Sequence, residues 1–230
     1  MQDRHRSQRI AAADAAARLG LDQSRVRALA KSGQLPAEKL ANRWFIDAGA
    51  LERRIANGPR SGRPFEPQRA WALLLLFSGE DAPWLSVSDR SKLRAIVRDR
   101  EFDDVRPRLR GRAEVRYFAG GERARDDLVK SPDLVRSGIS AAEHYSVSLR
   151  SSRVIDGYLP RRSAERAIYR HALREVEERG ADIVLRLADF WPLNGRAVAP
   201  VAAVAADLLD SLDERTARAG RQLARRLGAT

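Results

Sequence analysis

The spacing of apolar residues near the start of the chain predicts a short helix over residues 12–19. Ala15 and Ala16 lie about one helical turn before Leu19, so they fall on one face of that helix. Small alanines on this face let a second helix cross closely. Gly20 ends the helix, because glycine adopts the left-handed conformation that follows a helix end without a Cβ penalty.

A second helix is predicted over residues 23–32. Asp22 precedes it and can cap its first turn, where a carboxylate also favours the positive end of the helix. Val26 and Leu29 share the inward face. The polar residues occupy the opposite face and the first turn: Gln23, Ser24, Arg25, Arg27 and Lys31. This set of donors is typical of a recognition helix, which presents them to base edges and phosphates of DNA.

The next stretch, residues 33–46, predicts a turn followed by a short basic hairpin. A Gly/Pro signal opens the turn. Three polar residues lie near the hairpin tip: Lys39, Asn42 and Arg43. Trp44 and Ile46 alternate inward and close a small core, so the hairpin can lie along a phosphate backbone as a wing. Asp47 can then cap a last helix over residues 48–57.

This order of elements resembles the excisionase-like and MerR-like winged helix-turn-helix domains. The resemblance rests on the helix, the glycine turn, the recognition helix, the SGQLP turn and the basic wing that ends in RWFI. It covers roughly the first quarter of the chain and implies binding of double-stranded DNA at an operator. The sequence departs from the pattern at Ala11, where a capping Ser or Thr normally opens the first helix. The competing interpretation is an Ala-rich helix pair that packs on its neighbour and contacts no DNA.

Composition and the Pro/Gly-rich stretch NGPRSGRPFEPQ divide the chain into two domains. A chain of 230 residues with 43% hydrophobic content can hold one small and one medium core. We predict a winged helix-turn-helix domain over residues 1–58, a linker over 59–68 and a second domain over 69–230. From Pro67 a leucine-rich run predicts a buried helix that ends at Gly79.

Strand-like and helix-like segments alternate in the second domain. Ser88 caps a predicted helix over residues 89–98, and Ser137 caps another that runs through Tyr145. Strands are predicted over residues 113–118, 133–136, 154–159 and 183–187. Further helices are predicted to end near Lys130 or to span residues 161–170, 201–212 and 214–227. The pattern indicates an α+β fold, mainly α, with an N-terminal winged helix-turn-helix and a C-terminal mixed α/β domain.

Two stretches of the second domain resemble the C-terminal domain of the AbiEi-type antitoxins of type IV toxin-antitoxin systems. In VKSPDLVRSGISAAEHY the matching residues are Ser137, Gly138, Ala141, Ala142 and Tyr145. In APVAAVAADLLDSLDERTARAGRQLARRL they are Ala199, Pro200, Asp207, Leu208, Leu209, Arg215 and Gly220. The YLP at residues 158–160 falls where the family has a strand before a basic helix.

This second resemblance covers most of residues 100–230 and implies a function. Members of the family pair with a nucleotidyltransferase toxin, and their N-terminal domain represses the shared operon. The resemblance therefore implies an antitoxin that is also a repressor. The excisionase-like N-terminal domain departs from the usual wing type of the family, which leaves the operator geometry open.

The last predicted helix offers a surface for such a toxin. Four arginines follow one another at helical spacing as a basic stripe: Arg218, Arg221, Arg225 and Arg226. Leu223 and Leu227 lie opposite. One interpretation is that the stripe covers the acidic metal site of a nucleotidyltransferase, and the other is a solvated terminal helix. The junction from Ser137 to Tyr145 is the second candidate for partner binding.

The carboxylates that precede this helix also have two interpretations. They gather near a predicted helix end: Asp207, Asp210, Asp213 and Glu214. The first interpretation is a solvated helix cap. The second is a surface that receives a basic partner.

The sequence carries no pattern that predicts an enzyme. The histidines His5, His144 and His171 are too scattered for a metal site or a catalytic triad. The paired, alternate carboxylates of a nucleotidyltransferase strand are missing. With no cysteine, disulfides and thiolate zinc sites are excluded. We therefore expect no catalytic residue, no metal and no cofactor.

Charge and hydropathy favour a cytoplasmic protein with a polyanionic partner. The net charge is +12, and residues 1–68 hold 13 basic against 7 acidic side chains, so the first domain is the more basic per residue. Arginine and alanine dominate throughout, so part of this basicity reflects composition. The longest apolar run, from Trp71 to Phe77, is too short to span a bilayer, and the N-terminus lacks an apolar signal core.

Two classes of function follow from the sequence. The first is an antitoxin that represses its own operon and neutralises a nucleotidyltransferase toxin. The second is a stand-alone transcriptional regulator, or an excisionase-like accessory protein, whose second domain senses a ligand or oligomerises. The sequence leaves open whether the protein binds DNA as a homodimer. A nucleotidyltransferase gene beside this one would favour the first class.

Overall fold

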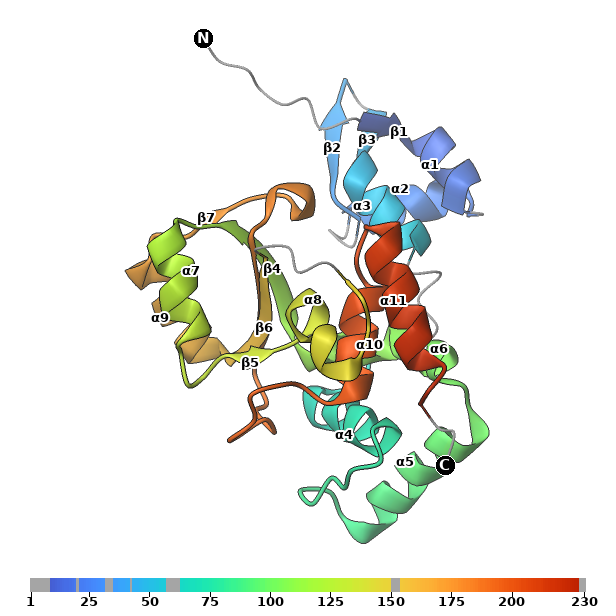
Figure 1. Ribbon diagram of the computed structural model, residues 1–230. Helices are drawn as coiled ribbons and strands as arrows, with labels where there is room; N and C mark the ends of the chain where they lie inside the picture. Colours follow the sequence, from blue (N-terminus) through green and yellow to red (C-terminus); the bar gives the residue numbers. More distant parts are fainter. Residues whose placement is uncertain are drawn as a thin grey trace. The chain divides into compact units, whose positions relative to one another are not determined.

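The computed structural model describes residues 9–19, 21–31, 35–41, 43–56, 63–149 and 154–227. The chain divides into two compact units, residues 1–60 and 61–230, and Figure 1 labels the elements of both. The predicted helix stop at Gly20, the wing residue Asn42 and the first part of the predicted linker, residues 59–62, lie outside the described residues.

The first unit combines short helices with a small antiparallel sheet. Its elements are β1 (Arg9–Ala11), α1 (Ala12–Leu19), α2 (Gln23–Lys31), β2 (Ala37–Leu40), β3 (Arg43–Asp47) and α3 (Ala48–Ala56). The strand order is β1-β3-β2, with Ile10 opposite Ile46 and Lys39 opposite Trp44. The predicted helices and hairpin are confirmed. Strand β1 was not predicted, because its three residues are too few to show an alternating pattern.

The core of the first unit joins its helices to the hairpin. Val26 of α2 is buried with Ile46 of β3, and Trp44 packs against the same cluster. Asp47 caps α3 as expected, since its Oδ1 accepts a hydrogen bond from the amide of Ala50 at 2.7 Å. Strand β3 of the hairpin is therefore fixed to the helices.

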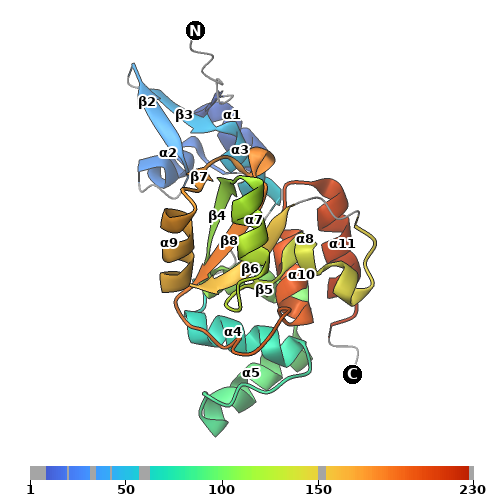
Figure 2. The ribbon, with the colours of Figure 1, turned by 60° about the vertical axis from the view of Figure 1, so that its left-hand side comes forward.

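The second unit is built on a five-stranded sheet (Figure 2). Its strands are β4 (Glu114–Ala119), β5 (Val135–Arg136), β6 (Ile155–Pro160), β7 (Arg174–Glu175) and β8 (Ile183–Ala188). They lie in the order β5-β6-β8-β4-β7. Strands β6 and β8 are parallel, and the other neighbours are antiparallel. Parallel neighbours require a crossover connection, and the segment between them that contains a helix supplies it.

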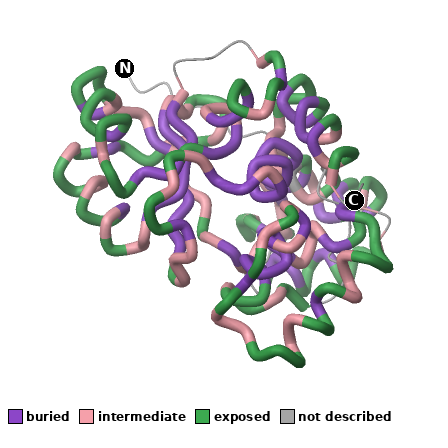
Figure 3. Tube along the Cα trace, turned by 60° about the horizontal axis from the view of Figure 1, so that its bottom comes forward, coloured by how far each residue is buried: buried purple, intermediate pink, exposed green. Residues whose placement is uncertain are grey.

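Helices cover both faces of this sheet. The helices of this unit are α4 (Pro67–Phe77), α5 (Val87–Asp99), α6 (Phe102–Val105), α7 (Glu122–Val129), α8 (Gly138–Ala141), α9 (Arg161–Arg170), α10 (Val201–Leu209) and α11 (Glu214–Ala224), of which α5 packs on α4. Short 3-10 helices are η1 (Arg106–Arg112), η2 (Glu143–Tyr145) and η3 (Glu178–Gly180). Helices α7 and α9 share one hydrophobic core with Leu159 of β6. Helices α4, α10 and α11 share another with the adjacent residue Tyr158, whose side chain lies on the opposite face of the strand. Figure 3 shows the buried segments. The predicted α+β fold, mainly helical, is confirmed.

The leucine-rich helix α4 is a core element, as predicted. Leu73 and Leu74 are fully buried. Trp71 is also buried, and its Nε1 donates to the carbonyl of Arg112 at 3.0 Å, so the indole N–H is satisfied. A helix without a polar face can be stable only when other elements surround it.

The second half of the predicted linker is part of the second unit. Phe65 packs against the core around α4, and its amide donates to the carbonyl of Arg108 at 2.9 Å. Helix α4 already begins at Pro67. This end of the predicted linker is therefore held to the second unit by packing and hydrogen bonding.

Two predicted helix caps are corrected. Ser86, not Ser88, caps α5 by accepting from the amide of Asp89 at 3.1 Å. Ser137 precedes α8, but its hydroxyl bonds elsewhere, and α8 ends after one turn. Both errors concern serines next to a helix start, where tertiary contacts decide which hydroxyl faces the helix. Among the described residues, no helix has the length and apolar character that crossing a membrane requires.

Candidate nucleic-acid interface and partner surface

Helix α2 presents a polar face away from the core of the first unit. Its inner face buries Val26, Leu29 and Ala30. All five side chains of this helix that were predicted to bind DNA are exposed: Gln23, Ser24, Arg25, Arg27 and Lys31. Burial of the apolar residues leaves the opposite face of α2 exposed, and every predicted donor lies on this exposed face or in the first turn.

Along this face the donors are arranged around a small residue. Ser24, Arg27 and Lys31 are three and four residues apart, which places them in one row along the helix. Ala28 is also exposed, and because it lies four residues after Ser24 and three before Lys31, it shares their face of the helix, beside Arg27. A methyl group there lets the helix approach the floor of a groove closely. Sequence inspection did not single out Ala28, because an alanine in an Ala-rich helix carries no distinctive signal.

The β2–β3 hairpin forms the predicted wing. Lys39 and Arg43 are both exposed beside its tip, and Leu40 pairs with Arg43 across the turn. Ala41 has a φ of 43°, a left-handed conformation that a tight hairpin turn requires. Two basic side chains therefore flank a narrow projection of the backbone.

The basic side chains of this interface are electrostatically available. Elsewhere in the first unit, Arg9 pairs with Glu38 at 2.8 Å and Arg18 approaches Glu52 at 3.5 Å. In contrast, the cations of α2 and the wing form no ion pair with any described carboxylate: Arg25, Arg27, Lys31, Lys39 and Arg43. An unpaired surface cation loses no internal partner when it binds a phosphate.

The arginine stripe predicted near the C-terminus is only partly available. Arg218 and Arg225 are exposed. Arg221 pairs with Glu214, which lies seven residues earlier at the start of α11, and Nη1 of Arg226 donates to the carbonyl of Tyr145 at 3.0 Å. Helix α11 ends at Ala224, so the last two arginines follow the helix. Leu223 and Leu227 pack toward the core, as predicted.

The Ser137–Tyr145 junction has a structural explanation. Ser137 is fully buried, so its predicted role at a partner surface is corrected: a side chain without exposed area offers nothing to a partner. Gly138 has a φ of 44°, and a Cβ there would lie 1.8 Å from Oδ2 of Asp156. Tyr145 is partly exposed, and its hydroxyl donates to the carbonyl of Ala199 at 2.6 Å.

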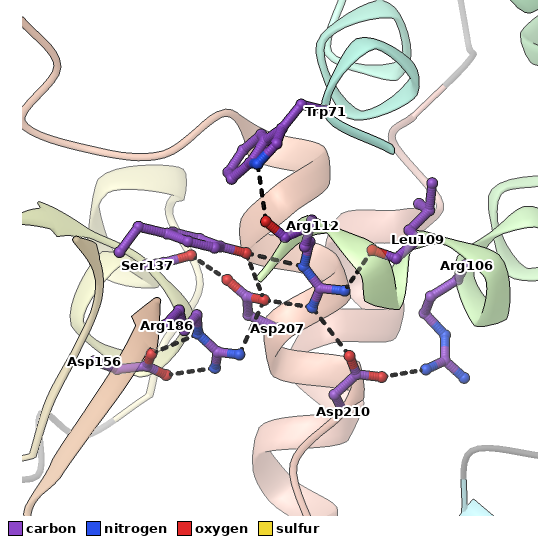
Figure 4. Close-up of polar contacts among 10 residues, drawn as sticks. Trp71, Arg106, Leu109, Arg112, Ser137, Asp156, Arg186, Asp207 and Asp210 are labelled. Carbon is purple, nitrogen blue, oxygen red and sulfur yellow. Dashed lines mark hydrogen bonds and ion pairs between the residues drawn. The ribbon is translucent and has the colours of Figure 1, made fainter. Parts of the chain in front are cut away.

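Ser137 belongs to a buried network of charged side chains (Figure 4). Asp207 lies at its centre, and Oδ1 of this residue accepts from Nη2 of Arg112 at 2.6 Å and from the Tyr158 hydroxyl at 2.9 Å. Nη1 of Arg186 lies 3.1 Å from the same oxygen. The hydroxyl of Ser137 donates to the other oxygen, Oδ2.

Further carboxylates extend the network on both sides. Nε and Nη2 of Arg186 bind the two oxygens of Asp156 at 2.9 and 3.1 Å. Arg112 also reaches Asp210 at 3.0 Å, and Arg106 binds the second oxygen of Asp210 at 2.6 Å. Three guanidinium groups thus face three carboxylates, which compensates the charges that the fold buries.

Burial and pairing shift the pKa values in this network. Burial raises the pKa of Asp156, and the Arg186 guanidinium opposes this shift. Burial also disfavours ionised Asp210, but Arg112 and Arg106 outweigh it and hold the pKa of that carboxyl below its usual value. Burial raises the pKa of Tyr158, which therefore remains a hydrogen-bond donor.

The network is a structural device of the second unit. It joins η1, β6, β8 and α10 through side chains whose charged groups face one another. It also corrects the interpretation of the acidic group near α11. Asp207 and Asp210 bind arginines, whereas Asp213 and Glu214 are exposed, and Asp213 caps α11 by accepting from the amide of Thr216 at 2.7 Å.

Sequence inspection missed Arg112, Asp156 and Arg186, although two of them carried a signal. Arg186 interrupts the apolar strand IVLRL, and Asp156 interrupts VIDGYLP. A charged residue inside an otherwise apolar strand indicates a buried partner of opposite charge. Arg112 had no such context. No group of three or more His, Cys, Asp or Glu side chains suited to a metal ion is found within the described ranges.

Comparison with known proteins identifies the first unit. A family model described as a helix-turn-helix domain matches residues 12–59, which contain α1, α2, the wing and α3. No curated protein and no solved structure matches the chain. The first unit is therefore similar to helix-turn-helix domains, and this similarity supports a role in DNA binding.

Proposed function

We propose that the protein is a transcriptional regulator that binds double-stranded operator DNA, with α2 in the major groove and the β2–β3 wing on the phosphate backbone. The observation that carries this proposal is the exposed face of α2. Its arginine and lysine side chains have no ion-pair partner among the described residues, and glutamine and serine donors lie beside them. Arginine and glutamine bind base edges in pairs of hydrogen bonds, so this face supports sequence recognition as well as affinity.

Direct binding to the DNA upstream of the protein's own reading frame tests this proposal. Fluorescence anisotropy with that fragment, against a mixed-sequence duplex of the same length, measures both affinity and specificity. We expect the upstream fragment to bind roughly a thousandfold more tightly at physiological salt, within the usual range for specific regulators. Equal affinities for both duplexes would leave a non-specific binder and contradict operator recognition.

Occupancy of the operator by a homodimer is a further part of this proposal. A single helix-turn-helix contacts a short half-site, and dimers place two such helices about one helical turn of DNA apart. The mass of the protein–DNA complex, measured by light scattering, gives the stoichiometry. One protomer on the minimal upstream site would show that the homodimer is not needed.

We further propose that the second unit neutralises a nucleotidyltransferase toxin, which makes the protein an antitoxin that represses its own operon. The support is the resemblance of VKSPDLVRSGISAAEHY and of the α10–α11 region to AbiEi-type antitoxins, together with a separate core for residues 61–230. In this proposal Arg218 and Arg225, the exposed members of the stripe that bind no other described residue through their guanidinium groups, contact the acidic metal site of the toxin.

Co-expression with the neighbouring gene product tests neutralisation. The parent should rescue growth of cells that produce the toxin, and the double variant Arg218→Glu/Arg225→Glu should fail to do so. The matched control is Arg162→Glu/Arg170→Glu, which reverses two exposed arginines of α9 and changes the net charge equally. Rescue by all three proteins would move the partner surface away from α11. No rescue by the parent would contradict the antitoxin role.

A further inference from the structure

The second unit contains a cavity of about 590 Å³ between its sheet and the α10–α11 turn. Val115 and Tyr117 of β4 and Val184 of β8 line it from the sheet, and Ile139 and Leu212 line it from the helical side. Small-molecule sites in proteins have volumes of roughly 300 to 1,000 Å³ and mainly apolar walls with a few polar groups. The size and the apolar surfaces of this cavity suit a small organic molecule.

The charges that line the cavity have the opposite sign to the protein as a whole. The chain carries a net charge of +12. Six carboxylates line the cavity: Asp156, Glu178, Asp207, Asp210, Asp213 and Glu214. Among the described residues, two guanidinium groups line it, those of Arg179 and Arg186. Although the protein has an excess of arginine, the described lining of this cavity holds more carboxylates than guanidinium groups, which favours a bound cation.

Most of these carboxylates already have a cationic or capping partner. The buried network compensates Asp156, Asp207 and Asp210, Glu214 pairs with Arg221, and Asp213 caps α11. Glu178 differs from the other five carboxylates, because its negative charge is not compensated by an ion pair with any described basic residue.

The two oxygens of Glu178 have different environments. Oε1 accepts from the amide of Leu212 at 2.8 Å and so holds the α10–α11 turn. Oε2 is buried and lacks a hydrogen bond of proper geometry from any described residue. Burial raises the pKa of Tyr117, and the charge of the Glu178 carboxylate and a hydrogen bond with that carboxylate raise it further, so the phenol stays neutral. Among the described residues, Glu178 is thus contacted by hydrogen-bond donors but forms no ion pair with a cation.

We propose that this cavity binds a small organic cation, an amine or amidine with an apolar body, whose charged group is recognised by Glu178. The apolar body would lie along Val115 and Val184, and the ring of Tyr117 adds an aromatic surface that attracts cations. The residues that line this cavity belong neither to α2 nor to the arginine stripe, and the proposal requires neither DNA binding nor toxin neutralisation. It gives the second unit a ligand that can affect the α10–α11 turn.

Three probes with the same ring and different charge test the proposal on the full-length protein. They are benzamidine, benzamide and benzoate, which carry a positive, a neutral and a negative head group. Ligand-observed NMR and calorimetry measure their affinities. We expect benzamidine to bind at least about tenfold more tightly than benzamide, and benzoate to bind most weakly.

Two matched variants locate the charge that is responsible. Glu178→Gln removes the negative charge but keeps an oxygen that can accept from the Leu212 amide, so the fold is maintained. It should weaken benzamidine about tenfold and leave benzamide unchanged. Glu177→Gln removes the same charge from the adjacent exposed residue and should leave both affinities unchanged.

A third variant tests whether binding occurs inside the cavity. Ala181→Phe places a ring in the space that Ala181 lines and adds no charge, so it should abolish binding of benzamidine, with circular dichroism as the check on folding. The proposal is overturned if benzamidine does not bind at millimolar concentration, if it binds no better than benzamide, or if Glu178→Gln binds it as tightly as the parent.

Discussion

The two units use the same side chain in opposite ways. In the first unit, Arg25 and Arg27 lie on the surface and form no ion pair with a described residue. In the second unit, Arg112 and Arg186 are almost fully buried and every charged contact is with a carboxylate of the same unit. An arginine count therefore says little about nucleic-acid binding. What matters is whether the fold has already neutralised the guanidinium group.

The largest effect is expected where the arginine is buried. Arg186→Met removes the cation that faces Asp156 and Asp207 and keeps much of the apolar volume. Breaking a buried ion pair from one side leaves an uncompensated charge and lowers the free energy of unfolding by about 3 to 5 kcal/mol. Urea unfolding followed by tryptophan fluorescence measures it. Arg162→Met on exposed α9 is the control, and a loss under about 1 kcal/mol for Arg186→Met would contradict the structural role.

The next effect concerns an arginine without an internal partner. Arg27→Ala should weaken binding to the upstream DNA by about 1 to 3 kcal/mol and reduce discrimination against mixed-sequence DNA, with no change in unfolding. Arg18→Ala, which removes an exposed arginine that approaches Glu52 in the same unit, is the control for net charge. If the two variants bind equally, Arg27 contacts no base.

A smaller effect is expected at Asp213, whose carboxylate accepts hydrogen bonds from the backbone amide and the hydroxyl of Thr216. Hydrogen bonds from Thr216 lower the pKa of Asp213 from its ordinary value of 3.8, and removing a helix cap destabilises by about 1 kcal/mol. Because the folded pKa is the lower one, this stabilisation is complete above the unfolded pKa and disappears as the pH falls through the folded pKa. Asp213→Ala should therefore be less stable than the parent at neutral pH and equal to it in strong acid.

The control for this capping prediction is Asp126→Ala, which removes an exposed carboxylate from α7. Thermal unfolding at several pH values compares the three proteins. A constant difference between Asp213→Ala and the parent down to strongly acidic pH would show that the side chain acts through packing and not through its charge.

The smallest effect is expected at the wing. Lys39→Ala and Arg43→Ala should each weaken all DNA sequences alike and reduce the slope of log K against log salt by about 0.9, since each removes one phosphate contact. Binding isotherms at several salt concentrations give the slope. Glu38→Gln, a charge change on the same strand, should not reduce it. A loss of specificity in either cationic variant would instead place that side chain at a base.

Local sequence patterns predicted most of the helices and strands of the first unit. They could not predict which distant charged residues pair in the second unit. The α2 face follows from Val26 and Leu29, whose spacing alone decides which side is buried. The partners Arg112 and Asp207 are 95 residues apart, and nothing local joins them. Likewise the serine that caps α5 and the burial of Ser137 depend on tertiary contacts. The sequence signal that could have indicated the buried network was a charged residue inside each of two apolar strands, Asp156 and Arg186.

The exposed Ala28 on α2 has a consequence for how this domain can acquire new targets. None of the donors around it contributes to the core, so each can be exchanged with a change in stability of about 0.5 kcal/mol or less. Ala28 itself can be replaced by a longer side chain that adds a contact to an adjacent base. Recognition can therefore drift one position at a time. The buried arginines allow no such drift, because an altered residue there must be matched by a second change elsewhere in the chain.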